Sequence, residues 1–128
     1  MAAEPAFAVT PRIGSVALGS AETSYTAPTN VATVIAGAST GTRIAEVVVQ
    51  MNATVSSATM VRLFLYDGSN YFLFDEVAIA AATGSQSVKQ TRVSITYNNL
   101  VLPSSSWSLV ATVHSSNGGI VTALGADL

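Results

Sequence analysis

Apolar and polar residues alternate along most of the chain after Asn30, and this alternation predicts β-strands that turn one face to a core. Within residues 43–54, for example, Val47, Val49 and Met51 recur at every second position. Glycine, serine, asparagine and proline separate such segments and predict turns. Seven strands are expected in this part of the chain, over residues 31–36, 43–54, 59–66, 71–78, 87–97, 107–114 and 120–124.

This spacing predicts an all-β protein, an antiparallel β-sandwich of jelly-roll-like topology with seven or eight strands. Residues 1–30 hold three of the four prolines and show no clean period. We interpret them as an N-terminal arm with one short strand at residues 12–18, followed by a sandwich domain over residues 31–128. The segment VAIAAAT, residues 77–83, is the one helix candidate, and it is too short to be stable alone.

The segment RLFLYDGSNYFLFDE, residues 62–76, predicts a hairpin with large side chains around a tight turn. A loop over residues 67–70 would place Arg62 opposite Asp75, an arrangement that stabilises paired strands. A two-residue turn at Asp67 and Gly68 would shift the register and lose this pair. The charges therefore favour the first register.

In that register the two faces of the hairpin are both apolar. One face is expected to belong to the core and carries Val61, Leu63, Leu65, Phe72 and Phe74. The other face carries Phe64, Tyr66, Tyr71 and Leu73. Side chains of this kind need cover, because an exposed apolar patch marks an interface. The cover would come from the arm, from a second layer of the same chain, or from another subunit.

The composition narrows the function classes. The chain has 128 residues, which indicates one domain, and no cysteine. Charged residues make up 9% of the chain, against about 25% in a typical soluble domain. The net charge of −2 gives no basic surface for nucleic acid.

No apolar stretch has the length of a membrane span, and MAAEPAFAVTPRIG lacks the pattern of a signal peptide. Low charge is tolerated when much of the surface faces fixed neighbours in an assembly.

The candidate catalytic residues in the sequence do not combine into an active site of a known kind. GASTG, residues 37–41, matches the G-x-S-x-G pattern with Ser39 as nucleophile, which requires a following helix and a histidine partner. The following residues predict a strand, and His114 is the sole histidine. One histidine without cysteine cannot build a usual metal site. Asp75 and Glu76 are adjacent, so they point to opposite faces of a strand. We expect no enzymatic activity and no cofactor, with a Ser39 hydrolase as the alternative to be tested.

Four segments resemble a known group of proteins: TPRIG, TVIAGASTGTRIAEVVVQ, MVRLFLYDGSNYFLFDEV and LVLPSSSWSLVATVH. Their succession is similar to that of small β-sandwich virion proteins of tailed bacteriophages, of the capsid decoration, cement or head-fibre type. The resemblance spans residues 10–127. It implies a β-sandwich that binds the outer surface of a capsid, with the major capsid protein as partner, and it carries over no catalytic residue.

From this resemblance we expect a homo-oligomer on the capsid exterior, and by analogy a trimer. No membrane or nucleic-acid partner is expected. The alternative is a tail or fibre module that binds host surface carbohydrate. Contact residues are expected in two places. Those in the arm are Pro5, Phe7, Pro11, Arg12 and Ile13. Those on the outer face of the hairpin are Phe64, Tyr66, Tyr71 and Leu73.

Overall fold

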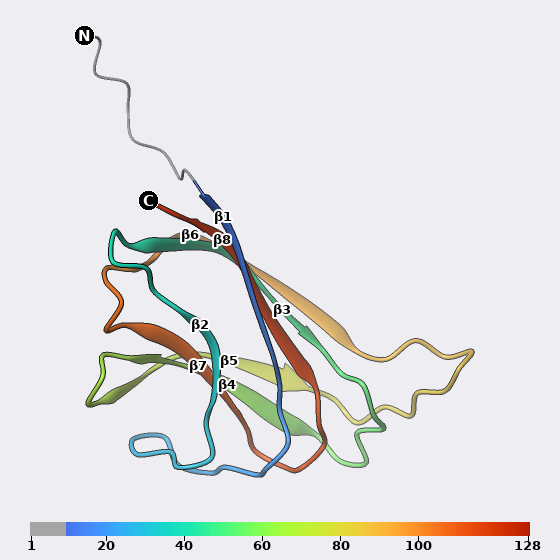
Figure 1. Cartoon of the computed structure of the whole chain (residues 1–128). Coiled ribbons are helices and arrows are strands. Elements are labelled where there is room, and N and C mark those ends of the chain that lie inside the picture. Colours follow the sequence, from blue (N-terminus) through green and yellow to red (C-terminus); the bar gives the residue numbers. More distant parts are fainter. Residues whose placement is uncertain (1–9) are drawn as a thin grey trace, which may run out of the picture.

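The computed structural model of the protein describes residues 10–128 and contains eight β-strands (Figure 1). The strands are β1 Thr10–Ala17, β2 Ala32–Ala36, β3 Thr42–Gln50, β4 Thr59–Tyr66, β5 Tyr71–Ile79, β6 Arg92–Leu102, β7 Ser108–Val113 and β8 Ile120–Asp127.

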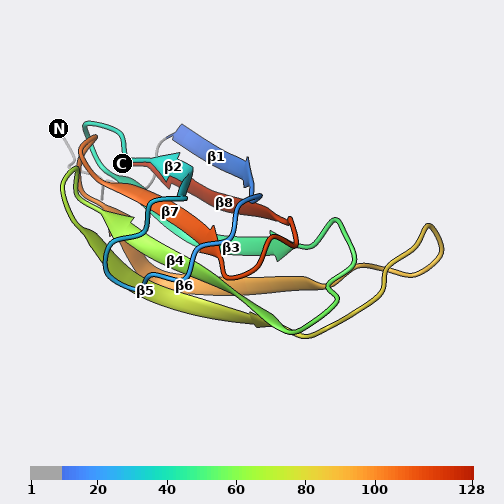
Figure 2. The ribbon, with the colours of Figure 1, turned by 90° about the horizontal axis from the view of Figure 1, so that it is seen from below.

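The strands form two four-stranded sheets with the orders β1-β8-β3-β6 and β2-β7-β4-β5. All neighbouring strands are antiparallel. The sheets are stacked as two layers, and the chain crosses repeatedly from one to the other (Figure 2). This is the arrangement of a jelly roll, in which two Greek keys close on each other. The all-β fold class predicted from the sequence is confirmed.

The predicted strands are present, but several bounds differ: β3 ends at Gln50 instead of residue 54, and β8 continues beyond residue 124 to Asp127. β6 spans Arg92–Leu102, so it begins and ends five residues later than the 87–97 pattern predicts. The helix prediction for residues 77–83 is wrong, because β5 continues to Ile79. Val77 and Ile79 are buried while Ala78 is exposed, which is the two-residue period of a strand. Alanine enrichment gave a helical signal that pairing with β4 overrides.

The hydrophobic core fills the space between the sheets. Val47, Val49 and Met51 are buried there, as their alternation predicts. Trp107, which precedes β7, packs against the core and is half-buried. The largest wholly buried core side chains come from both layers and are Ile44, Met51, Leu63, Ile79, Leu102 and Leu109.

One edge of the sandwich is closed by backbone contact between β1 and β2. Gly14 lies so close to β2 that a Cβ atom at this position would meet the carbonyl oxygen of Val34 and approach the Ile35 Cβ atom to 2.7 Å. Glycine thus permits the close approach of the two edge strands. β1 lies within the range predicted as an arm, and it pairs with β8 along its whole length.

Candidate interaction surface

The β4–β5 hairpin has the predicted loop, followed by a bulge. Tyr66 pairs with Tyr71 across residues 67–70. The Asp67 carboxylate accepts hydrogen bonds from the backbone N–H groups of Ser69 (2.9 Å) and Asn70 (2.7 Å). These bonds lower the pKa of Asp67 below its usual value. A turn of this kind is what an Asp-Gly-Ser-Asn sequence favours.

The register changes at Phe74, which the bulge leaves without a partner in β4. Arg62 therefore lies opposite Glu76, and its Nε atom donates to the Glu76 carboxylate at 3.0 Å. The predicted pair of Arg62 with Asp75 is wrong. A one-residue bulge moves every later side chain of β5 to the other face, and no sequence signal marks it.

The burial of the hairpin aromatics also differs from the prediction. Phe64, expected on a contact surface, is wholly buried. Phe72 and Phe74, expected in the core, are 49% and 38% exposed. The cause is that β5 is the edge strand of its sheet, so its inward-facing side chains have neighbours on one side only.

Phe64 is covered by the chain's own loop between β1 and β2, residues 18–31. This loop lies across the outer face of the β2-β7-β4-β5 sheet (Figure 2). Ala21 forms a bridge with Val113 at the end of β7. Residues 26–29 line a cleft together with residues 69–72 of the hairpin. Part of the segment predicted as an arm therefore covers this sheet within the same chain.

Arg62 connects the loop to the sheet. The residue is 3% exposed, and its guanidinium donates to the Tyr25 hydroxyl at 2.9 Å and lies 4.2 Å from the centre of the Tyr25 ring. It also contacts the Glu22 carbonyl oxygen at 3.5 Å and His114 Nδ1 at 3.4 Å. A buried cation is tolerated when such partners replace water. The sequence did not indicate this role for Arg62.

Glu22 fixes the shape of the same loop. Its carboxylate accepts hydrogen bonds from the backbone N–H groups of Asn30 (2.7 Å), Thr29 (2.8 Å) and Ser24 (3.1 Å). These bonds stabilise the charged form and lower the pKa of Glu22 to about 2. Nothing in the sequence alone marks this glutamate, because its partners are backbone groups.

A row of partly exposed rings follows the edge formed by β5. The planes of the Phe72 and Trp107 rings are inclined by 25° with centroids 6.4 Å apart, and the Phe74 and Tyr97 centroids are 5.3 Å apart. The Tyr97 hydroxyl donates to the Asp75 carboxylate at 2.7 Å. Burial and this bond raise the pKa of Tyr97. We call Phe72, Leu73 and Phe74, with the adjoining Tyr97 and Trp107, the aromatic edge.

The remaining hairpin candidates lie beside this edge. Tyr66 and Tyr71 stack with centroids 4.3 Å apart, and both are half-buried. The Tyr66 hydroxyl donates to the Gly68 carbonyl oxygen at 3.0 Å, so it closes the turn. Leu73 is 41% exposed. Of the four predicted outer-face residues, Leu73 is thus the most exposed and Phe64 is inaccessible.

The contact residues predicted near the N-terminus fall partly outside the described residues and partly on β1. Pro5 and Phe7 lie outside the described residues. Pro11 and Ile13 lie on β1, where Ile13 is 67% exposed on the outer face of the β1-β8-β3-β6 sheet. Arg12 is half-buried and bonds to the Asp127 carboxylate at 2.8 Å. Arg12 therefore holds β1 to β8.

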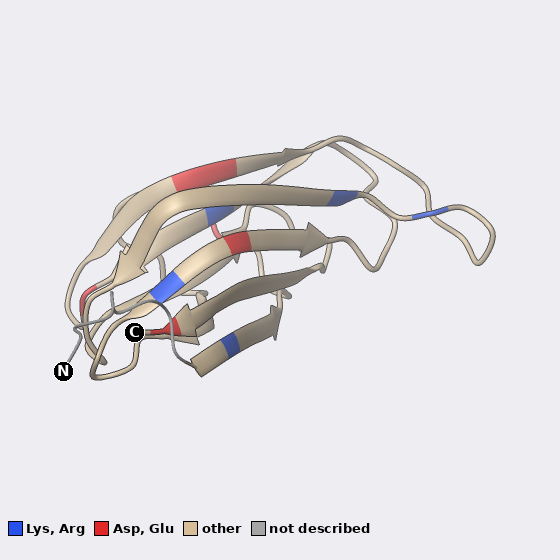
Figure 3. Ribbon diagram, turned by 90° about the horizontal axis from the view of Figure 1, so that it is seen from above, with Lys and Arg blue, Asp and Glu red and all other residues tan. Residues whose placement is uncertain are grey.

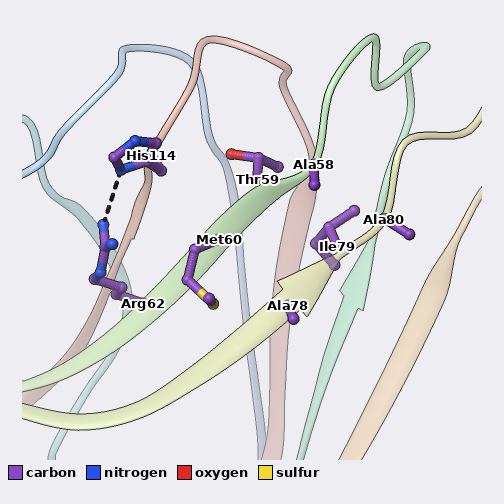
Figure 4. A pocket seen from close by; sticks show the side chains of 8 residues that line it. All are labelled: Ala58, Thr59, Met60, Arg62, Ala78, Ile79, Ala80 and His114. Atoms are coloured by element: carbon purple, nitrogen blue, oxygen red, sulfur yellow. Dashed lines mark hydrogen bonds between the residues drawn. The ribbon is translucent and has the colours of Figure 1, made fainter.

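A shallow cleft of about 540 Å³ opens beside Arg62 at the other end of the hairpin (Figure 4). His114 and Arg62 lie at one side of it, and Met60, Ala78 and Ala80 form its apolar part. The Arg62 guanidinium is engaged by Glu76 and Tyr25. The cleft therefore presents little more than an apolar floor beside one histidine.

Ser39 and His114 are far apart. Ala36, at the start of the loop that holds Ser39, pairs with Ser108 at the beginning of β7. His114 follows the opposite end of that strand, about 20 Å away at about 3.3 Å per residue. The structure does not bring these two residues together.

Within residues 10–128, no group of three or more histidine, cysteine or acidic side chains is placed to hold a metal, and no helix there is long and apolar enough to cross a membrane.

Taken together, these features define a jelly-roll β-protein with one sheet face covered by its own loop and an aromatic edge left open. No protein-family model matches the chain, and no curated protein matches it.

Solved structures of viral capsids align with this chain. A chain of the acid-stable capsid structure of Helicobacter pylori bacteriophage KHP30 aligns with a TM-score of 0.57 and 16% identity, over 94% of this chain and 90% of that one. A pentameric capsid protein from metagenomic phage sequences aligns with a TM-score of 0.44 and 11% identity, over 90% of this chain and 59% of that one. At this identity the KHP30 match shows a common fold. The resemblance to small β-sandwich virion proteins is confirmed at that level.

Proposed function

We propose that this chain is a non-enzymatic structural protein of a bacteriophage virion, and that it decorates the outer surface of the head. The observation that carries the proposal is the match to the KHP30 capsid chain, which covers nearly the whole length of both chains. The two chains share the fold over this length. The match supports a structural role in the virion, and the partner that we propose is the major capsid protein.

The surface supports binding to a lattice. Ile13 on the outer face of one sheet and Phe72, Leu73 and Phe74 on the edge of the other are exposed in the single chain. Apolar surface of this kind marks interaction sites. A protein that binds the assembled shell but not its dissociated subunits stabilises the shell by mass action, and an oligomer, for which we favour a trimer, would add avidity.

The proposal is tested by mixing the purified chain with expanded capsids that lack it, followed by sedimentation. The chain should pellet with capsids at a saturating, fixed ratio and raise the temperature at which they disrupt. Mass spectrometry of purified virions should find it. If it neither pellets with capsids nor occurs in virions, the proposal is wrong.

The neighbouring Phe72 and Trp107 rings favour one alternative, a tail or fibre module that binds host surface carbohydrate. Sugar rings stack on flat aromatic surfaces of this kind. A glycan array would then show binding that is lost in Phe72→Ala, and that is weakened in Tyr66→Ala and Tyr71→Ala. Decoration predicts no glycan binding and intact capsid binding of Tyr66→Ala.

A further inference from the structure

The loop between β5 and β6, residues 80–91, is a projecting finger. Ser85 and Val88 exchange two backbone hydrogen bonds of 3.2 and 3.3 Å, which close its tip. A bridge between Val55 and Ala82 holds its base. Val88 at the tip is 52% exposed. In Figure 1 this loop extends beyond the body of the sandwich. The loop connects strands of different sheets, and it is longer than the roughly 4–6 residues of most connections.

The aromatic edge lies toward the other end of the molecule. It follows the turn at residues 67–70, where β5 begins, whereas the finger follows Ile79, where β5 ends. Leu73 and Ile79 are about 20 Å apart at about 3.3 Å per residue, and the finger points away from the body (Figure 1). The finger therefore cannot cover the aromatic edge of its own chain.

The charges of the two surfaces are opposite. The hairpin carries Asp67, Asp75 and Glu76, and its single cation, Arg62, is buried. Residues 77–126 contain no acidic side chain, and Lys89 at the finger is exposed. Figure 3 shows acidic residues on β5 and a basic position on the projecting loop, with the other basic residues spread over the strands. Complementary charge of this kind orients partners and selects among them.

We propose that the finger of one copy binds the aromatic edge of a second copy, with Val88 on the exposed Leu73 side chain and Lys89 beside the Glu76 carboxylate on the same face of β5. The contact joins two different surfaces at opposite ends of the folded molecule, so it is a head-to-tail contact. Such contacts generate closed rings when the rotation that relates successive copies divides a full turn evenly. An edge strand with exposed apolar side chains would be protected by such cover. This contact goes beyond the proposed function, because it requires no capsid.

The absence of cysteine from the chain permits a direct test by single-cysteine crosslinking. Leu73→Cys and Val88→Cys chains are purified separately, mixed and mildly oxidised. The mixture should give disulfide-linked dimers containing one chain of each kind, at about tenfold the yield of either variant alone. Ile13→Cys mixed with Val88→Cys is the matched control, because Ile13 is exposed on a different face. A Leu73–Val88 yield no higher than this control overturns the proposal.

Sedimentation of the full chain provides a second measure that does not depend on disulfide geometry. The wild type should self-associate with increasing concentration, and Lys89→Glu should weaken this association about tenfold. Lys89→Arg keeps the charge and should associate as the wild type does. A wild type that stays monomeric at high concentration, or a Lys89→Glu variant that associates normally, contradicts the head-to-tail contact. Capsid pelleting of a monomeric chain would leave the decoration role standing, so the two failures are distinguishable.

Discussion

Replacement of Arg62 by alanine should detach the β1–β2 loop from the sheet that it covers. The charged hydrogen bond to the Tyr25 hydroxyl, at 2.9 Å, is worth about 1.5–3 kcal/mol. The contact with the Tyr25 ring, which is half exposed, adds about 0.5–1 kcal/mol. The Glu76 carboxylate is 36% exposed, so this pair contributes about 0.5 kcal/mol. The sum is about 3 kcal/mol.

The assay is urea denaturation of wild type and variant, with the free energy of unfolding extrapolated to water. A loss of about 3 kcal/mol should also lower Tm by about 10 °C for a domain of this size. Tyr25→Phe keeps the ring and loses the hydroxyl, which contributes the largest part of the sum, so it should cost about two-thirds as much. Chymotrypsin should cleave after Tyr25 faster in Arg62→Ala.

Arg62→Met is the variant that could refute this reasoning. Methionine fills similar space without the polar contacts, and hydrophobic replacements of buried ions are sometimes neutral. If Arg62→Met unfolds at the wild-type urea concentration and resists chymotrypsin equally well, the ionic contacts do not hold the loop and the calculated sum is wrong.

Three further changes test other parts of the fold. The folded-state pKa of Glu22 is about 2, below its ordinary 4.5, so its contribution to stability is present above about pH 4.5 and is lost as the pH falls toward 2; acid titration of unfolding should show this loss in wild type and a smaller one in Glu22→Gln. Gly14→Ala should cost about 1–3 kcal/mol in urea because its Cβ meets β2, whereas Gly19→Ala, with nothing within 4 Å, should cost far less; equal costs would contradict the closed edge. Phe64→Ala should cost about 3–5 kcal/mol, and Phe72→Ala, whose side chain is 49% exposed, less than half as much; the reverse order would restore the original assignment of faces.

The sequence predicts the strands well where one face alternates clearly. Val47, Val49 and Met51 recur every second residue and are buried in the core. The boundaries of β6 were missed because residues 87–91 carry a polar alternation that no neighbouring strand pairs with. An alternating pattern indicates that a segment can form a strand. The residues at which the strand begins and ends are set by pairing with its neighbouring strand.

The candidate surface was harder to predict, because it depends on features with no local signature. The bulge at Phe74 changes the face of the later β5 residues, so Arg62 meets Glu76 instead of Asp75. The cover over Phe64 comes from a loop near residue 25, held by contacts far apart in sequence. That the hairpin needed cover was apparent from its composition, but which residues received it required the tertiary structure.

The central claim, that this chain decorates the outside of a phage head, is tested most directly by a reconstruction of capsids with and without the added chain. Decoration predicts additional density of jelly-roll shape on the outer surface, repeated at equivalent positions of the lattice. Identical reconstructions, or density confined to the tail or to the interior of the head, would contradict it.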